Sequence, residues 1–293
     1  MIKHFLSVIK PGIVAGNLVV ATASYFMAVM GNIHWPCFLA MTVGTGCVIA
    51  SGCVLNNWID RDIDGLMQRT RQRVMVLRLI SEPVVLGYAI LLGFAGFGLL
   101  ALMTNKIVVF AGILGFSVYV GLYSFWLKRC SVFSTLVGGI AGACPPVMGY
   151  CSGTGTLDSG AVILFLAFYL WQIPHAYAIA IHRLDDYKNA RIPVLPVRAG
   201  PQVMRYHMVF YILAFTLVAL LLAQQHYVGS MYSVFMALLG GIWFLLAVQK
   251  NRQKPRLWAR RIFLFSLVVV ISISALMMLD CHPDVFYGDM VRR

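Results

Sequence analysis

The sequence has few charged residues and very few acidic ones. Only 11% of its 293 residues are Asp, Glu, Lys or Arg, only 10 are acidic, and 60% are hydrophobic. A soluble globular domain carries about 25% charged residues. This composition excludes an ordinary soluble domain and predicts an integral membrane protein.

The sequence also lacks paired cysteines and an evident leader segment. None of its seven Cys residues forms a C-x-x-C pair, so we expect neither a zinc site nor a disulfide framework. The first ten residues resemble neither a cleavable signal peptide nor an arginine-rich transit segment. We therefore expect a bacterial inner membrane rather than a mitochondrial origin.

Nine apolar runs are each long enough to cross about 30 Å of hydrocarbon. They predict an all-α bundle of nine transmembrane helices, which forms one domain over residues 1–293. The expected spans are 12–31, 36–58, 83–103, 107–127, 132–152, 160–181, 206–224, 229–248 and 262–280.

The basic residues lie almost entirely on one side of this predicted bundle. All Lys and Arg residues except Lys106, Arg292 and Arg293 fall in the N-terminal tail or in alternate connections. Positive connections are cytoplasmic, so we expect a cytoplasmic N-terminus and an external C-terminus. This topology also accounts for the net charge of +13 without nucleic-acid binding. The long, acid-containing connections 59–82 and 182–205 are expected to cap an active site at the cytoplasmic face.

Three oxygen-bearing side chains share one helix face at the end of the second apolar run. Asn56, Asp60 and Asp64 are spaced i, i+4 and i+8. Such hard oxygen ligands suit Mg²⁺ and, through it, a diphosphate, and carboxylates beside hydrocarbon usually mark function. The alternative is a solvated loop that sets topology. The basic residues that follow suit the remaining diphosphate oxygens: Arg69, Arg71 and Arg73.

A second polar stripe lies on the sixth apolar run and its extension. His175, His182 and Asp186 are spaced i, i+7 and i+11, which again returns to one face. His175 follows Pro174 well inside the apolar run. It either makes a polar contact between helices or touches a polar ligand or a haem iron. For His182, at the membrane edge, the interhelical contact is favoured.

Two further clusters have two interpretations each. Tyr123, Lys128 and Arg129, at the end of the fourth run, either bind phosphate or anchor the helix at the interface. The fifth run contains small residues and a proline pair, which allow either tight helix packing or a widened cavity for a flat ligand. These residues are Gly138, Gly139, Gly142, Pro145, Pro146 and Gly149.

The pattern Asn56-x-x-x-Asp60-x-x-x-Asp64 resembles the first aspartate motif of the UbiA-type intramembrane prenyltransferases. Further strings resemble the branch of this family that farnesylates haem, and the resemblance covers roughly residues 5–280. These strings are Leu55 to Asp64 with Arg69-Thr70 and Arg73, Tyr123 to Arg129, Gly142 to Tyr150, Trp171 to His175, and Asp186-Tyr187 with Ile192 to Pro196.

The resemblance implies a nine-helix enzyme that uses Mg²⁺ to bind farnesyl diphosphate. It implies farnesyl transfer to the 2-vinyl group of haem B with addition of water, which gives haem O and releases diphosphate. Haem B is then a substrate rather than a cofactor, and a haem–copper terminal oxidase or haem A synthase is expected downstream. The implied catalytic residues are Asp60, Asp64 and Asp186; the metal ligands are Asn56, Asp60 and Asp64; and the substrate-binding residues are Asn57, Arg69, Arg73, Tyr123, Lys128, Arg129, His175 and Tyr187.

One departure from the family pattern concerns the second acidic motif. Here it is reduced to Asp185-Asp186-Tyr187, with Ala190 four residues after Asp186. A second Mg²⁺ held by two spaced carboxylates is therefore not expected. Two other functions remain as alternatives: prenyl transfer to a quinone precursor or a chlorophyll-like ring, and transport. Transport is disfavoured, because transporters place ionisable residues near the bilayer midplane within paired halves. In this sequence the acidic residues lie at the membrane border, and an odd number of spans does not divide into paired halves.

Overall fold

The computed structural model describes residues 2–249 and 254–281. This part contains helices and no β-strand, so the all-α prediction is confirmed. The basic residues Lys250, Arg252, Arg292 and Arg293, which entered the topology prediction, lie outside the described residues. The elements are α1 (Ile2–Val8), α2 (Pro11–Val29), α3 (Trp35–Ile59), α4 (Arg61–Gly65), α5 (Glu82–Met103), α6 (Lys106–Ser117), the π-helix η1 (Val118–Leu127), α7 (Lys128–Cys130), α8 (Ser134–Thr154), α9 (Ser159–His182), α10 (Leu184–Asn189), α11 (Leu195–Gln224), α12 (Ser230–Val248) and α13 (Pro255–Leu279).

Eight helices among the described residues are long and apolar enough to cross a membrane. They agree with eight of the nine predicted spans to within a few residues at most ends. α13 starts at Pro255, seven residues before the predicted start at 262. The eight are α2, α3, α5, the continuous segment Lys106–Cys130, α9, the part of α11 from Gln202 to Gln224, α12 and α13.

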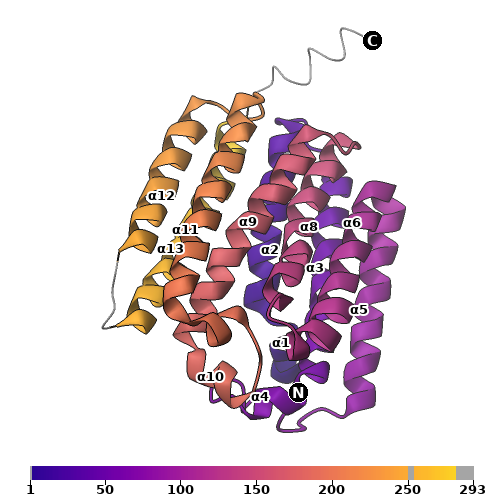
Figure 1. Cartoon of the computed structure of the whole chain (residues 1–293). Helices are drawn as coiled ribbons and strands as arrows, with labels where there is room; N and C mark the ends of the chain where they lie inside the picture. The colour runs from indigo at the N-terminus through magenta and orange to yellow at the C-terminus, as the bar shows by residue number, and fades with distance from the viewer. Residues whose placement is uncertain (1, 250–253, 282–293) are drawn as a thin grey trace.

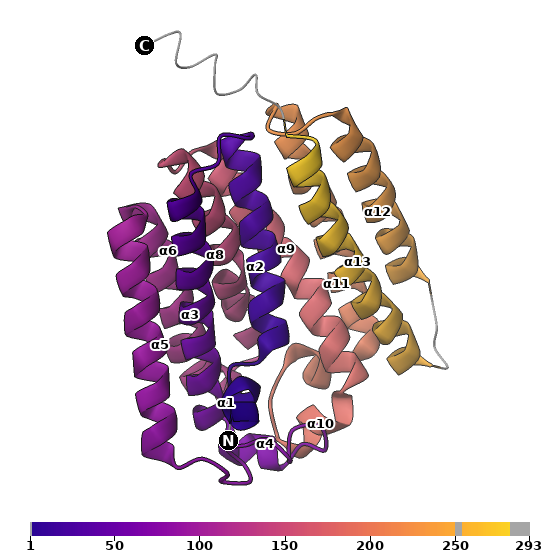
Figure 2. The same ribbon diagram turned by 180° about the vertical axis from the view of Figure 1, so that it is seen from behind.

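The ninth predicted span corresponds to α8, which has 21 residues and lies among the long helices (Figures 1 and 2). It packs against α2, α6 and α9. Its glycines, prolines and hydroxyl residues make it less apolar than the other eight, and much of it is buried against its neighbours. A count of nine crossings, and the orientation of the two termini, stay predictions.

Side chains at the helix starts explain where two of the spans begin. Asn105 accepts hydrogen bonds from the backbone N–H groups of Ile107 and Val108 at 3.0 and 3.1 Å. Asp158 accepts one from the N–H of Ala161 at 3.2 Å. These caps satisfy N–H groups that have no partner within the helix.

The two long connections contain short helices instead of irregular loops alone. The connection 59–82 contains α4, and the connection 182–205 contains α10 and the first part of α11. α11 begins at Leu195 rather than near 206, and it is interrupted at Gly200, whose φ of +78° breaks the helical backbone. Both connections therefore present short helices at the end of the bundle.

The long helices pack side by side around α9 (Figure 1). α2, α3, α5, α6 and α8 lie to one side of α9, and α11, α12 and α13 lie to the other, an arrangement that Figure 2 shows from behind. The short helices α1, α4 and α10 gather at one end of the bundle, next to the end of α3. This end carries the polar cluster that the sequence singled out.

Candidate active site

Asn56 and Asp60 lie at the C-terminal end of α3 and contact each other directly. Asn56 Nδ2 donates to Asp60 Oδ2 at 2.8 Å. The backbone N–H of Asp64 donates to the carbonyl of Asp60 at 2.8 Å, and Asp60, whose φ of −86° and ψ of 1° are not helical, joins the end of α3 to the start of α4. All three side chains are buried, and the Asp60 side chain is 0% exposed.

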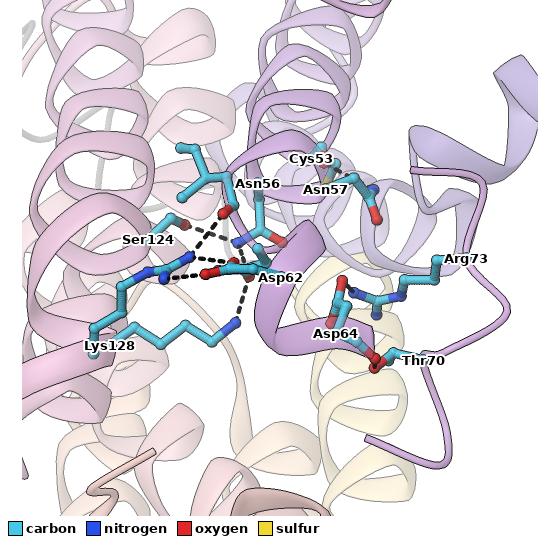
Figure 3. Close-up of polar contacts among 12 residues, drawn as sticks. Cys53, Asn56, Asn57, Asp62, Asp64, Thr70, Arg73, Ser124 and Lys128 are labelled. Atoms are coloured by element: carbon cyan, nitrogen blue, oxygen red, sulfur yellow. Dashed lines mark hydrogen bonds and ion pairs between the residues drawn. The ribbon is translucent and has the colours of Figure 1, made fainter. Parts of the chain in front are cut away.

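Two lysines reach this acidic face from other segments of the chain. Lys128 of α7 forms an ion pair with Asp60 Oδ2, and Lys10, just before α2, donates to Asn56 Oδ1. Ser124 of η1 accepts a hydrogen bond from Asn56 Nδ2 at 2.9 Å. Figure 3 shows Ser124 and Lys128 on the same side of Asn56. Four segments of the chain thus converge on one polar cluster.

Asp64 is held by the turn that follows α4. Arg73 pairs with Asp64 Oδ2 at 2.6 Å, and Thr70 donates its hydroxyl to the carbonyl of Asp64 at 2.9 Å (Figure 3). The Asp64 side chain is 3% exposed and that of Arg73 is 26% exposed. The connection 59–82 therefore folds back so that Arg73 faces Asp64.

The second oxygen of Asp60 is buried and has no partner. Oδ1 accepts no hydrogen bond in the described part of the chain. An unpartnered buried carboxylate oxygen is costly, and a cation bound beside it removes that cost. Within residues 2–249 and 254–281, no group of three His, Cys, Asp or Glu side chains lies close enough to hold a metal ion. The oxygens of Asn56, Asp60 and Asp64 fit a Mg²⁺ ion that also takes ligands from a substrate.

Positive charge is in excess at this cluster. The pKa of Lys10 is lowered to about 8, mainly by burial and in addition by the charges of Arg73 and Lys128, which outweigh the opposing effect of Asp60. Lys10 also adopts a left-handed backbone conformation, with φ of +53°. This conformation separates α1 from α2 and lets the side chain reach Asn56. The positive charges of Lys10, Arg73 and Lys128 repel one another, and a bound polyanion would relieve this repulsion.

Arg129 joins α7 to α4 at the rim of the cluster. Its guanidinium makes two hydrogen bonds of 2.7 Å to the carboxylate of Asp62, and another of 2.8 Å to the carbonyl of Ile59. The hydrogen bonds from Arg129 lower the pKa of Asp62 to about 2. Because the Asp62 side chain is 60% exposed, this pair lies in solvent rather than in the buried cluster.

The π-helical segment η1 aligns two tyrosines beside the acidic face. The rings of Tyr119 and Tyr123 are stacked, with centroids 6.0 Å apart. The Tyr123 ring packs against Gly138 of α8, where an added Cβ would lie 2.9 Å from the ring. Gln172 packs even more closely against Gly142. These α8 glycines accommodate side chains of neighbouring helices, and π-helical segments are frequent at functional sites.

The second long connection meets the first through Asp186. Asp186 is buried, and its Oδ1 accepts a hydrogen bond of 2.8 Å from the backbone N–H of Gln68. Burial raises the pKa of the neighbouring Tyr187, and the nearby charges of Lys128 and Arg69 oppose that rise. Tyr187 is therefore within electrostatic reach of the cluster around Asp60, and Arg69 is exposed at its edge.

His175 and His182 face α13 rather than α3. His175 Nδ1 lies 2.7 Å from the hydroxyl of Ser266, and His182 Nδ1 lies 3.4 Å from the carbonyl of Arg256. His182 makes the interhelical contact that was favoured for it. A role of His175 at the haem stays a prediction.

The structure brings together most of the residues that the sequence singled out, but not all of them. Asn57 points away from the carboxylates (Figure 3), and its amide donates to the carbonyls of Val8 and Cys53 at 2.7 and 3.0 Å. It anchors α1 to α3. Sequence reasoning missed Lys10 as a site residue, because membrane topology already accounted for a lysine before the first span. The only signal was its position next to Pro11 at a helix start.

The model of the UbiA prenyltransferase family matches residues 17–269 of the chain. Curated relatives named protoheme IX farnesyltransferase are similar over nearly the whole length. The protein of Pectobacterium carotovorum subsp. carotovorum is 48% identical over 96% of this chain and 95% of its own length. The protein of Photorhabdus laumondii subsp. laumondii is 47% identical over 96% of both chains.

Solved structures share the fold at low identity. A digeranylgeranylglyceryl phosphate synthase superposes with a TM-score of 0.78 at 16% identity, over 95% of this chain and 99% of its own. A UbiA homolog from Archaeoglobus fulgidus bound to GPP and Mg²⁺ superposes with a TM-score of 0.72 at 14% identity, over 94% of this chain and 99% of its own. With the family match and the apolar helices, these likenesses identify a multi-pass membrane enzyme. The chain belongs to the UbiA prenyltransferase family and is a prenyltransferase.

Proposed function

We propose that the enzyme transfers a farnesyl group from farnesyl diphosphate to the 2-vinyl group of haem B, with addition of water, to give haem O and diphosphate. Relatives named protoheme IX farnesyltransferase support this acceptor, because they are 47–48% identical over 96% of the chain. The observation that carries the proposal is the convergence of three cations on the buried face of Asn56, Asp60 and Asp64. Such a cluster suits an ionising diphosphate.

We propose Mg²⁺ as the cofactor, held by Asn56, Asp60 and Asp64 together with oxygens of the diphosphate. The unpartnered Oδ1 of Asp60 supports this assignment, as does the homolog described as bound to GPP and Mg²⁺. When bound, the ion neutralises charge on the leaving group, which eases cleavage of the bond between farnesyl C1 and its oxygen.

Lys10, Arg73 and Lys128 are the proposed donors to the remaining diphosphate oxygens. In the structure they bind Asn56, Asp64 and Asp60, the same side chains that are proposed to ligate the metal. These cations therefore turn from the carboxylates to the diphosphate when substrate binds. Arg69, Arg129 and Tyr187 lie at the rim and complete the binding of the diphosphate. Asp186 holds the two connections together and supplies the second acidic group.

The proposed transfer begins at the diphosphate. The C1–O bond of farnesyl diphosphate breaks, and its electron pair leaves with the diphosphate. The π electrons of the vinyl group form the new carbon–carbon bond to farnesyl C1, which leaves a cation on the vinyl carbon next to the porphyrin ring. Water adds to that carbon and loses a proton to solvent or to the released diphosphate. The stacked rings of Tyr119 and Tyr123 offer aromatic faces that stabilise the allylic cation.

We further propose that the site faces the cytoplasm of a bacterial inner membrane. The N-terminus is then cytoplasmic, the C-terminus external, and the connections 59–82 and 182–205 cap the site. α1, α4 and α10 gather beside the cluster, which supports such a cap. A haem–copper terminal oxidase or a haem A synthase is the proposed consumer of the product.

An acceptor comparison tests this function. Purified enzyme in lipid nanodiscs receives farnesyl diphosphate and Mg²⁺ with haem B, with a 4-hydroxybenzoate-type quinone precursor, or with no acceptor. We expect a farnesylated product with haem B alone. A farnesylated quinone precursor and an unchanged haem would assign the enzyme to another acceptor.

A further inference from the structure

The side-chain amide of Gln172 lies inside the bundle without a hydrogen-bonding partner. Gln172 is on α9, about 15 Å from the end of this helix at His182 for a rise of about 1.5 Å per residue. Its side chain is half-buried and makes no hydrogen bond within residues 2–249 and 254–281. An amide taken out of water without a hydrogen bond is costly. This group therefore suits a polar molecule that binds inside the membrane-spanning part.

A glycine of α8 fixes where the amide lies. The amide of Gln172 occupies the space that a β-carbon at Gly142 would take. Gly138, one turn earlier on the same face of α8, receives the ring of Tyr123 in the same way. One turn of a helix is about 5.4 Å long. The amide therefore lies about one turn deeper in the bundle than the ring of Tyr123.

The stacked tyrosines connect this position to the acidic face. Tyr119, which stacks on Tyr123, lies against Gly52 of α3, where an added Cβ would be 3.2 Å from its ring. Gly52 is one turn before Asn56 on α3. The order along the bundle is therefore the acidic face, then the two tyrosines, then the amide of Gln172. A substrate whose diphosphate binds at the acidic face extends its apolar part toward the tyrosines and Gln172.

The proposed reaction needs a water molecule at this depth. Farnesyl transfer leaves a cation on the vinyl carbon next to the porphyrin ring, and this cation has two fates. Either a lone pair of water forms a carbon–oxygen bond and the water loses a proton, or the neighbouring carbon loses a proton and a double bond forms. The second product is lighter than the first by one water. The hydrocarbon of a bilayer contains no water to share, so hydration requires a group that holds one.

We infer that the amide of Gln172 holds the water that adds to the vinyl cation, so that the product is an alcohol rather than an alkene. This inference rests on the proposed function, which supplies both the cation and the need for water. A carboxamide offers an oxygen acceptor and two N–H donors. A water that donates to the amide oxygen keeps a lone pair for the vinyl carbon, and the released diphosphate accepts its proton. Gln172 takes no proton itself and is a positioning residue.

The ratio of the two products tests this role. Enzyme in lipid nanodiscs receives haem B, farnesyl diphosphate and Mg²⁺, and the hydrated and dehydrated farnesylated haems are quantified by mass spectrometry. The wild type should form mainly the hydrated product. Gln172→Leu is similar in size but apolar, and should raise the ratio of dehydrated to hydrated product about 10-fold. This factor corresponds to about 1.4 kcal/mol, which is expected for one hydrogen bond. Gln172→Glu keeps an oxygen acceptor and should retain the wild-type ratio.

Thr216→Val is the matched control. Thr216 of α11 also packs on a glycine of the next helix, Gly240 of α12, and its hydroxyl donates to the carbonyl of Ile212 at 2.8 Å. It is thus a polar side chain seated on a glycine, but away from α8, and the variant should keep the wild-type ratio. Gln172→Met is a second apolar variant, and the melting temperature of every variant is recorded so that the ratio is taken from folded protein.

An unchanged ratio in the folded apolar variants of Gln172 would overturn the inference. The same shift in Gln172→Glu or in Thr216→Val would do so too, because the effect would then be one of packing. Loss of both products in a folded apolar variant would assign Gln172 to farnesyl transfer rather than to hydration. A wild type that farnesylates haem, with variants that leave the ratio unchanged, contradicts the inference alone. A wild type that forms neither product contradicts the proposed function, and the inference falls with it.

Discussion

Replacement of Asp60 by Asn is the sharpest perturbation of the acidic face. The Asp60 side chain is completely buried, its Oδ2 binds Lys128 and Asn56, and its Oδ1 has no partner. Asn has nearly the same shape, so the helix packing is kept. The substitution removes the negative charge and replaces one candidate metal ligand by an amide, so we expect loss of turnover.

The expected fall in kcat and the expected loss of folding free energy can each be estimated. Stabilisation of transition-state charge by a bound metal is worth several kcal/mol. If about 4 kcal/mol is lost, at about 1.4 kcal/mol for each tenfold change, kcat falls roughly 10³-fold. Removing one partner of a buried ion pair also costs about 3–5 kcal/mol of folding free energy, because Lys128 is left unpaired. A loss of activity must therefore be separated from a loss of folded protein.

The assay measures farnesyl diphosphate binding as a function of Mg²⁺ concentration, on protein whose melting temperature is recorded. In the wild type, Mg²⁺ should tighten binding; in Asp60→Asn, binding should become nearly independent of Mg²⁺ even in the folded fraction. Asp62→Asn is the matched control, because that carboxylate is two residues away but 60% exposed. Its surface pair is worth about 0–1 kcal/mol. An Asp60→Asn variant with more than a tenth of wild-type turnover and an unchanged Mg²⁺ response would refute the metal assignment.

Three further predictions concern groups around the same face. Arg73→Gln should raise KM for farnesyl diphosphate about 10-fold or more, since a hydrogen bond to a charged group contributes about 1.5–3 kcal/mol; a KM within twofold of the wild type would remove Arg73 from the diphosphate site. Because the pKa of Lys10 is lowered to about 8, Lys10 loses its charge as pH rises through 8, so KM for farnesyl diphosphate should rise above that pH. Lys10→Arg should abolish this rise, and its persistence would assign it to another group. The lowered pKa also means that the folded state binds fewer protons than the unfolded state between pH 8 and about 10.4, so Lys10 should make the fold more stable as pH rises across that range. Asn57→Ala should cost about 1–3 kcal/mol of folding free energy by releasing α1, as measured by thermal unfolding, and KM should stay unchanged; a raised KM with normal stability would return Asn57 to the substrate site.

The apolar runs were sufficient to predict most of the fold, because a helix in hydrocarbon must satisfy its own backbone hydrogen bonds and span a fixed thickness. The spacing of Asn56, Asp60 and Asp64 predicted neighbouring side chains, and Asn56 does contact Asp60, whereas Asp64 follows the non-helical backbone of Asp60 and pairs with Arg73. The periodicity of a sequence predicts which side chains lie near one another within a helix. It does not predict the break at Gly200 or the π-helical turns of η1, which depend on packing against other helices.

The parts of the site that escaped prediction come from distant segments. Lys10 meets Asn56 across 46 residues of sequence, and His175 meets Ser266 across 91. A lysine before a membrane span and a serine within one are both ordinary residues in a sequence. Only the fold gives them a specific partner. Asn57 was assigned to the substrate on the family resemblance, but it lies next to Asn56 only in sequence, because adjacent helix residues point in different directions.

The mass of the haem product tests the central claim most directly. Purified enzyme is incubated with haem B and farnesyl diphosphate, with Mg²⁺ or with a chelator, and the tetrapyrroles are analysed by mass spectrometry. The account predicts a species heavier than haem B by one farnesyl group plus water, formed only when Mg²⁺ is present. A folded enzyme that leaves haem B unmodified, or that modifies it equally well in the presence of the chelator, would contradict the account.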